Sequence, residues 1–78
     1  MQFKPILSFE PIEPLPILER KIKQLFLGKL VVVRHGNYET FCFGTLIHFE
    51  INAGRTILIL ENFNKKMIVQ NPSLIKVI

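Results

Sequence analysis

The chain has 78 residues and a formal net charge of +4, 49% of its residues are hydrophobic, and its one cysteine, Cys42, excludes an internal disulfide. So short a chain forms one domain and buries only about 60% of the surface that its unfolded form exposes, which excludes a large core. The cysteine and histidine spacings that zinc sites require are absent, so the sequence suggests neither a metal nor another cofactor.

An N-terminal arm is predicted over residues 1–13, ahead of a domain over residues 14–78. Three of the five prolines lie within residues 1–14. Each of them removes a backbone donor and favours an extended conformation at the residue before it. The apolar residues of the arm leave room for one short strand near Ile6 to Phe9, and we expect the arm to lie against another surface, such as a neighbouring subunit.

The segment LPILERKIKQLF, residues 15–26, has the pattern of an amphipathic helix. Apolar residues recur at i, i+4, i+7 and i+8, the spacing of one helix face, and the other face is charged or polar. The apolar residues are Leu18, Ile22, Leu25 and Phe26. Prolines on both sides of Leu15 suit the first turn of this helix, and Gly28 suits its end.

Two basic residues of the polar helix face, Lys21 and Lys23, are candidate phosphate contacts. A row of cations on one face attracts a polyanion through the release of counterions. The same residues are also compatible with an ordinary solvated face, in which Glu19 and Lys23 pair at i, i+4. Both interpretations stay open from the sequence.

Five β-strands are predicted after the helix, separated by the turn compositions HGN, NAG, NFNK and NPS. Their expected ranges are 29–34, 38–51, 55–62, 66–70 and 74–78. Antiparallel strands with such short connections cannot form a large two-layer sandwich, so we expect a small, closed or nearly closed barrel. The predicted fold class is mainly β, with an N-terminal α-helix followed by a five-stranded, strongly bent antiparallel SH3-like barrel.

Gly44 lies in the middle of the longest predicted strand, in the stretch FGTLIHFE. Glycine inside a strand usually marks a sharp bend, a bulge or the close approach of another backbone. A short sheet can wrap into a barrel only if its longest strand bends. We therefore expect a bend at Gly44, with Cys42 and Leu46 on one side of the bend and Phe49 returning to the core beyond it.

The order of these elements resembles the Sm-like (Sm/LSm) family, in particular its small, ring-forming, RNA-associated members of archaeal type. The start PLPILERKIKQLFLGKLVVV is similar to the opening of that family, FGTLIHFE to its first motif, TILILENF to its third strand, and MIVQNPSLIKVI to its second motif. The resemblance covers residues 14–78. It implies a homo-oligomeric ring of roughly six to eight subunits, in which the fourth barrel strand of one subunit pairs with the fifth of the next.

The resemblance also implies a single-stranded RNA site in the loops after the second and fourth barrel strands, which line the centre of the ring. The residues at these places are Asn52, Arg55, Gln70 and Asn71, and Lys21 and Lys23 add positive charge on the helix. The chain departs from the family where an Arg-Gly pair is usual, because Gln70 and Asn71 stand there. The same residues are also compatible with ordinary turns.

The first functional hypothesis is an Sm-like ring protein that binds single-stranded RNA or acts as an RNA chaperone or scaffold. The sequence pI of about 9.6 is compatible with a nucleic-acid partner. The changed Arg-Gly position favours the alternative, an SH3-like barrel that acts as a protein-interaction or assembly subunit and has lost nucleotide readout. Neither His35 nor His48 has a nucleophile or carboxylate at a catalytic spacing, so we do not expect an enzyme.

Nothing in the sequence predicts a membrane protein. No apolar run approaches the roughly 18 residues that a membrane-spanning helix needs. Prolines and glutamates near the N-terminus interrupt the apolar core that a signal peptide requires. We therefore expect a cytoplasmic protein.

Overall fold

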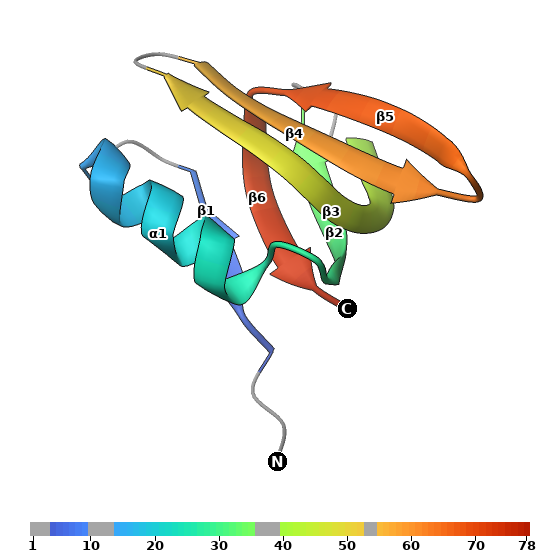
Figure 1. Ribbon diagram of the computed structural model, residues 1–78, viewed down its shortest axis with the longest axis horizontal. Helices are drawn as coiled ribbons and strands as arrows, with labels where there is room; N and C mark the ends of the chain where they lie inside the picture. The colour runs from blue at the N-terminus through green and yellow to red at the C-terminus, as the bar shows by residue number, and fades with distance from the viewer. Residues whose placement is uncertain (1–3, 10–13, 36–39, 53–54) are drawn as a thin grey trace.

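The computed structural model describes residues 4–9, 14–35, 40–52 and 55–78 (Figure 1). This part of the chain is mainly β, with one helix and six strands. The elements are β1 Ile6–Ser8, α1 Leu15–Leu25, β2 Leu30–His35, β3 Thr40–Asn52, β4 Arg55–Asn62, β5 Lys65–Gln70 and β6 Pro72–Val77. In Figure 1, β3, β4 and β5 run across the direction of β2 and β6, and α1 lies beside the sheet.

All described strands belong to one antiparallel sheet in the order β1-β6-β2-β3-β4-β5. The prediction of a mainly β, antiparallel fold with an N-terminal helix is confirmed. The sheet curves strongly in Figure 1, but the pairing of the described strands does not close it into a barrel, because β1 and β5 remain its two edges.

The sheet has six strands and not the five predicted for the barrel, because the short strand for which the sequence left room near Ile6 to Phe9 is present as β1 and joins the sheet. β1 pairs antiparallel with β6 in the register Ile6↔Lys76, Leu7↔Ile75 and Ser8↔Leu74. Two further backbone bonds of 3.0 Å extend this pairing at its ends, from the Phe9 N–H to the Ser73 carbonyl and from the Val77 N–H to the Pro5 carbonyl. Without the arm, the outer edge of β6 would expose its backbone groups, and the arm satisfies them.

α1 begins where the sequence predicts it and ends one residue earlier, at Leu25. Pro14 precedes it, and the carbonyl of Pro14 accepts the N–H groups of Ile17 and Leu18, which holds the first turn. The chain leaves the helix through Gly28, whose φ of +82° lies in the left-handed region that glycine adopts without strain. The Gly28 N–H donates to the Leu46 carbonyl at 2.7 Å and so ties the end of the helix to β3.

The core lies between α1 and the inner face of the sheet. Among the described residues, nine apolar side chains are buried there: Ile22, Phe26, Val31, Val33, Leu46, Leu58, Leu60, Val69 and Ile75. Ile22 comes from α1, Phe26 comes from the residue just after it, and the others come from β2 to β6. Leu7 and Phe9 of the arm pack against the edge of this core.

β3 changes its alternation at Ile47 rather than at Gly44. Leu46 pairs with Leu60 while His48 pairs with Ile59, so Ile47 is an extra residue and forms a bulge. Figure 1 shows β3 bending sharply through its middle. The bulge moves the core-facing positions from even to odd numbers: Cys42 and Leu46 face the core before it, and the prediction that Phe49 returns to the core is confirmed.

Gly44 instead permits the close approach of β4. A Cβ at Gly44 would lie 2.9 Å from the backbone oxygen of Glu61 and 3.1 Å from the Cβ of Leu60. Both neighbours belong to β4 and one of them is backbone, so a side chain at Gly44 would push the two strands apart. The expected bend therefore exists, but the glycine is needed for contact between strands.

The predicted strand bounds are close to those of the structure. β4 spans the predicted range, 55–62. β6 begins two residues earlier than predicted, at Pro72, which pairs with His35 of β2, and the first position of a strand tolerates proline. The predicted start of the longest strand, at residues 38 and 39, lies outside the described residues. Positive φ angles at Phe63 and Asn64 form the two-residue turn between β4 and β5.

Candidate nucleic-acid interface

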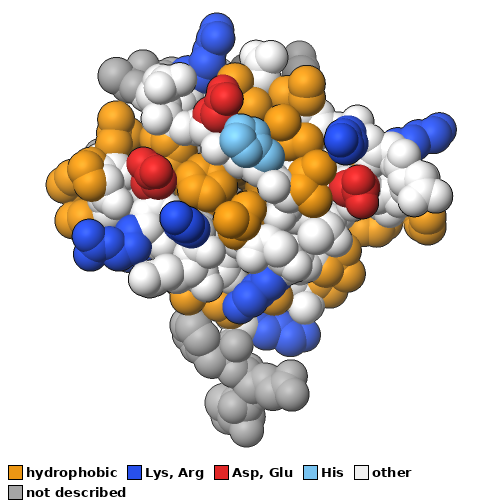
Figure 2. All heavy atoms as spheres, in the orientation of Figure 1, with side chains coloured by type: hydrophobic (Ala, Val, Ile, Leu, Met, Phe, Trp, Pro, Cys, Tyr) orange, Lys and Arg blue, Asp and Glu red, His pale blue; other side chains and the backbone are white. Residues whose placement is uncertain are grey.

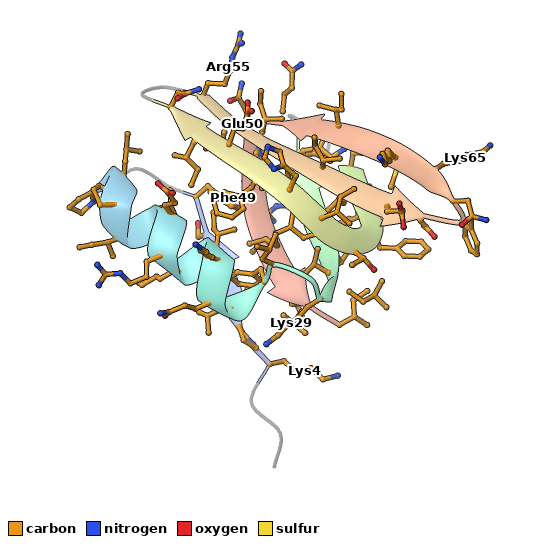
Figure 3. The ribbon with its side chains drawn as sticks, viewed as in Figure 1. Lys4, Lys29, Phe49, Glu50, Arg55 and Lys65 are labelled. Atoms are coloured by element: carbon orange, nitrogen blue, oxygen red, sulfur yellow. The ribbon has the colours of Figure 1, made fainter. Side chains whose placement is uncertain are left out.

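Four of the six candidate site residues lie together at one end of the sheet. Asn52 ends β3 and Arg55 begins β4, and the two residues pair in register. Gln70 ends β5 and pairs with Ile57, two residues into β4. Asn71 follows directly. We call Asn52, Arg55, Gln70 and Asn71 the polar end; all are exposed, and Figure 3 shows Arg55 projecting away from the sheet there.

Asn71 joins the two halves of the polar end. Its N–H donates to the carbonyl of Thr56 at 2.8 Å, and its Oδ1 accepts the N–H of Thr56 at 3.4 Å. Its φ of +51° is a left-handed value that asparagine tolerates better than most residues. Asn71 therefore holds β6 to the start of β4, and its Nδ2 donors and the second lone pair of its Oδ1 can still contact a ligand while these bonds persist.

An acidic residue, Glu50, lies beside the polar end. Glu50 pairs with Ile57 across β3 and β4, and Ile57 pairs with Gln70 on the other side, so the Glu50 carboxylate lies on the same face as Gln70. A carboxylate repels phosphate. His48 Nε2 lies 3.5 Å from Glu50 Oε1. The sequence spacing alone did not reveal this acidic neighbour.

Lys21 and Lys23 belong to a different surface, the outside of α1. Lys23 is exposed in the last turn of the helix, where a cation interacts favourably with the helix dipole, and Lys21 is half-buried. The surface beside Lys23 is an open, shallow depression lined by Pro16, Glu19, Arg20 and Gln24. In Figure 2 the Lys and Arg side chains appear as separate groups among hydrophobic ones, so the visible face carries no continuous basic patch.

Exposed aromatic side chains lie away from the polar end. Phe41 and Phe43 stand on the outer face at the start of β3, whereas Asn52 ends that strand. Phe63 is 84% exposed in the turn at the other end of β4. None of these rings is on the strand segments that form the polar end, so a base bound there would need hydrogen bonds and charge more than stacking.

Cys42 faces the core and is half-buried, and burial raises the pKa of its thiol above the ordinary value. We expect iodoacetamide to alkylate the native protein more slowly than the urea-unfolded protein at one pH near 8, because thiolate is the nucleophile. Since the folded pKa is the higher one, the stabilising contribution of this thiol is complete below its unfolded pKa of about 8.5 and is lost as the pH rises further. Equal alkylation rates in the native and the unfolded protein would contradict the raised pKa of the Cys42 thiol.

Among the described residues, no three His, Cys, Asp or Glu side chains gather closely enough to hold a metal ion. The helix in this part of the chain is too short and too polar to cross a lipid bilayer.

Comparisons of the chain with protein-family models, with curated proteins and with solved structures found no match.

Proposed function

We propose that the protein is an Sm-like subunit that binds single-stranded RNA, as a chaperone or scaffold without catalysis, and that copies of it form a cytoplasmic homo-oligomeric ring of roughly six to eight subunits. The observation that carries this proposal is the polar end, where two hairpin ends meet although their residues are far apart in the sequence. The helix ahead of a strongly bent second barrel strand supports the finer description of the fold as an Sm-type, SH3-like barrel.

Each residue of the polar end has a distinct part in this proposal. Arg55 supplies a cation for a phosphate, and the amides of Asn52 and Gln70 supply donors and acceptors for a base edge. Asn71 bonds the turn between β5 and β6 to the start of β4 and so sets the distance between Gln70 and the end of the β3–β4 hairpin. In a ring, symmetry repeats the polar end around a common centre, so several weak contacts act on one RNA strand. Lys21 and Lys23 add long-range attraction from the helix.

The test is the binding of a fluorescent oligouridine to the Arg55→Ala variant, measured by anisotropy over a range of salt concentrations. We expect an affinity loss of at least about tenfold at low salt, because a hydrogen bond to a charged group is removed in each subunit that contacts the RNA. The slope of log affinity against log salt should also fall, by about one phosphate contact for each of these subunits. Light scattering should show the same particle mass as for the unchanged protein.

Lys65→Ala is the matched control. It removes the same charge from the same pair of strands, but Lys65 pairs with Asn62 at the opposite end of β4, as Figure 3 shows. Its affinity should stay within about twofold of the unchanged protein. An Arg55→Ala variant that binds normally would show that the polar end is not the site. Equal losses in both variants would indicate a diffuse electrostatic attraction instead.

The alternative function, a protein-interaction or assembly subunit, is favoured by apolar side chains on the outside of the sheet. Ile68 is 66% exposed on the edge strand β5, and Phe41 and Phe43 are exposed on β3. Exposed apolar groups of this size often mark contacts with other chains. A defined particle that binds no oligouridine at low salt would favour this function over RNA binding.

A further inference from the structure

The outer edge of β6 is occupied by the protein's own arm, residues 4–9. Three residue pairs and two flanking backbone hydrogen bonds join the arm to β6. The opposite edge of the sheet is β5, which has β4 as its one neighbour among the described strands. The ring that we propose joins the β5 of one copy to the β6 of the next, and that join needs the edge that the arm covers.

The arm and β5 offer the same pattern of side chains to such an edge. In the arm, Leu7 and Phe9 are two residues apart and both pack against the core. In β5, Met67 and Val69 have the same spacing and also face the core side. Residues two apart lie on one face of a strand, so either segment could extend the same apolar surface beside β6.

We propose that the arm and the β5 strand of a second copy compete for the outer edge of β6, so that the arm must leave before two copies can join. This inference rests on the ring of the proposed function. One edge of a strand pairs with one neighbour, and its outward N–H and C=O groups cannot serve two partners at once. The arm thereby blocks an assembly interface of its own chain. In the assembled state, the outer edge of β6 is occupied by β5 of a second copy.

The lengths of the strands make the exchange feasible. β1 has three residues, whereas β5 and β6 each have six, so β5 can form a longer ladder with β6 than the arm does. The arm also carries Pro5, which has no N–H to donate to the ladder. The arm has the advantage of belonging to the same chain, which gives it a high effective concentration. Assembly should therefore depend strongly on protein concentration.

The experiment locks the arm in place with a disulfide. Ile6 and Lys76 are both exposed and face each other between hydrogen-bonded pairs, where Cα atoms lie about 4.5 Å apart and a disulfide can form. We would make Ile6→Cys with Lys76→Cys in a Cys42→Ala background and oxidise it with oxidised glutathione. Light scattering then gives the particle mass of the oxidised and the reduced protein at matched concentrations.

The oxidised protein should remain at the 9.1 kDa of one chain at every concentration. The reduced protein should gain mass with concentration, toward roughly six to eight chains. An oxidised protein that assembles as readily as the reduced one would overturn the competition and leave the ring proposal standing.

A second variant releases the arm. Leu7→Asp places a charge against the core, whereas the control Ile6→Asp places the same charge on the outward side of the same strand. We expect Leu7→Asp to lower the concentration at which half of the chains are assembled to about a tenth or less of its original value. Ile6→Asp should leave this concentration nearly unchanged. Circular dichroism checks that both variants are folded. If no assembly occurs even in folded Leu7→Asp, both the ring and the competition are wrong.

Discussion

Replacing Phe26 with alanine should lower the free energy of unfolding by about 3–5 kcal/mol, the usual loss for a fully buried phenylalanine. Phe26 is completely buried and is the largest such side chain among the described residues. It lies just after α1 and fills the space between the helix and the sheet. A domain of this size has a total stability on the order of 4–12 kcal/mol, so the variant should unfold at a much lower urea concentration.

Leu27→Ala is the control for this experiment. Leu27 is the next residue and is also apolar, but 36% of its surface is exposed. Its replacement should cost less than about 1 kcal/mol. Similar urea midpoints for the two variants would mean that Phe26 does not hold the helix on the sheet.

Gly44→Val should destabilise the protein by about 3 kcal/mol, because it overpacks a site that cannot yield easily. The new Cβ would lie against the backbone oxygen of Glu61, and a backbone atom moves only if β4 moves. At about 4–8 °C per kcal/mol for a domain of this size, the Tm should fall by roughly 12–24 °C. Thermal unfolding followed by circular dichroism measures this shift.

Gly28→Asn provides the comparison at another glycine. Gly28 has a positive φ, but a Cβ there would meet no atom within 4 Å. Asparagine tolerates this backbone conformation, so the Tm should change by only a few degrees. A Gly44→Val variant with an unchanged Tm would show that β4 can shift away from β3 at little cost.

Local signals explain why the helix and most strands were predictable. The apolar spacing that ends at Phe26 and the glycine at Gly28 both act within a few residues, so their effect can be recognised in the sequence. The turn after Asn62 likewise depends on the conformations of two neighbouring residues, Phe63 and Asn64. Such elements can be predicted without knowing which other segments pack beside them.

Features that depend on distant partners were not predictable in the same way. A short strand near Ile6 to Phe9 was expected, but its partner was not, and β1, which has only three residues, is held in the sheet by pairing with β6. The bulge at Ile47 depends on how β3 pairs with β4: one residue of β3 lies between Leu46 and His48, but none of β4 lies between their partners Leu60 and Ile59. A glycine was visible at Gly44, but its contact with Glu61 exists only once β4 has packed.

The candidate site was predictable in part, because its residues lie next to turns that the sequence itself indicates. Positions next to predicted turns placed Asn52, Arg55, Gln70 and Asn71 at strand ends, and the structure brings them to one end of the sheet. The bonds from Asn71 to Thr56 and the carboxylate of Glu50 beside Gln70 depend on strand register, which the sequence did not specify. RNA binding by this group stays a prediction.

The pairing of β1 and β2 with β6 has a consequence for the synthesis of the protein on the ribosome. β1 is made early and must wait for β6, which is made after all the other described strands. β2 can pair with β3 as soon as β3 is made, but its other edge must also wait for β6. Until then α1 and the hairpins formed by β3 to β5 have no complete sheet to pack on, and their apolar faces are open to other molecules. A ribosome that pauses before residue 72 would therefore hold a nascent chain with its core exposed, and that interval is when a chaperone would be most useful to it.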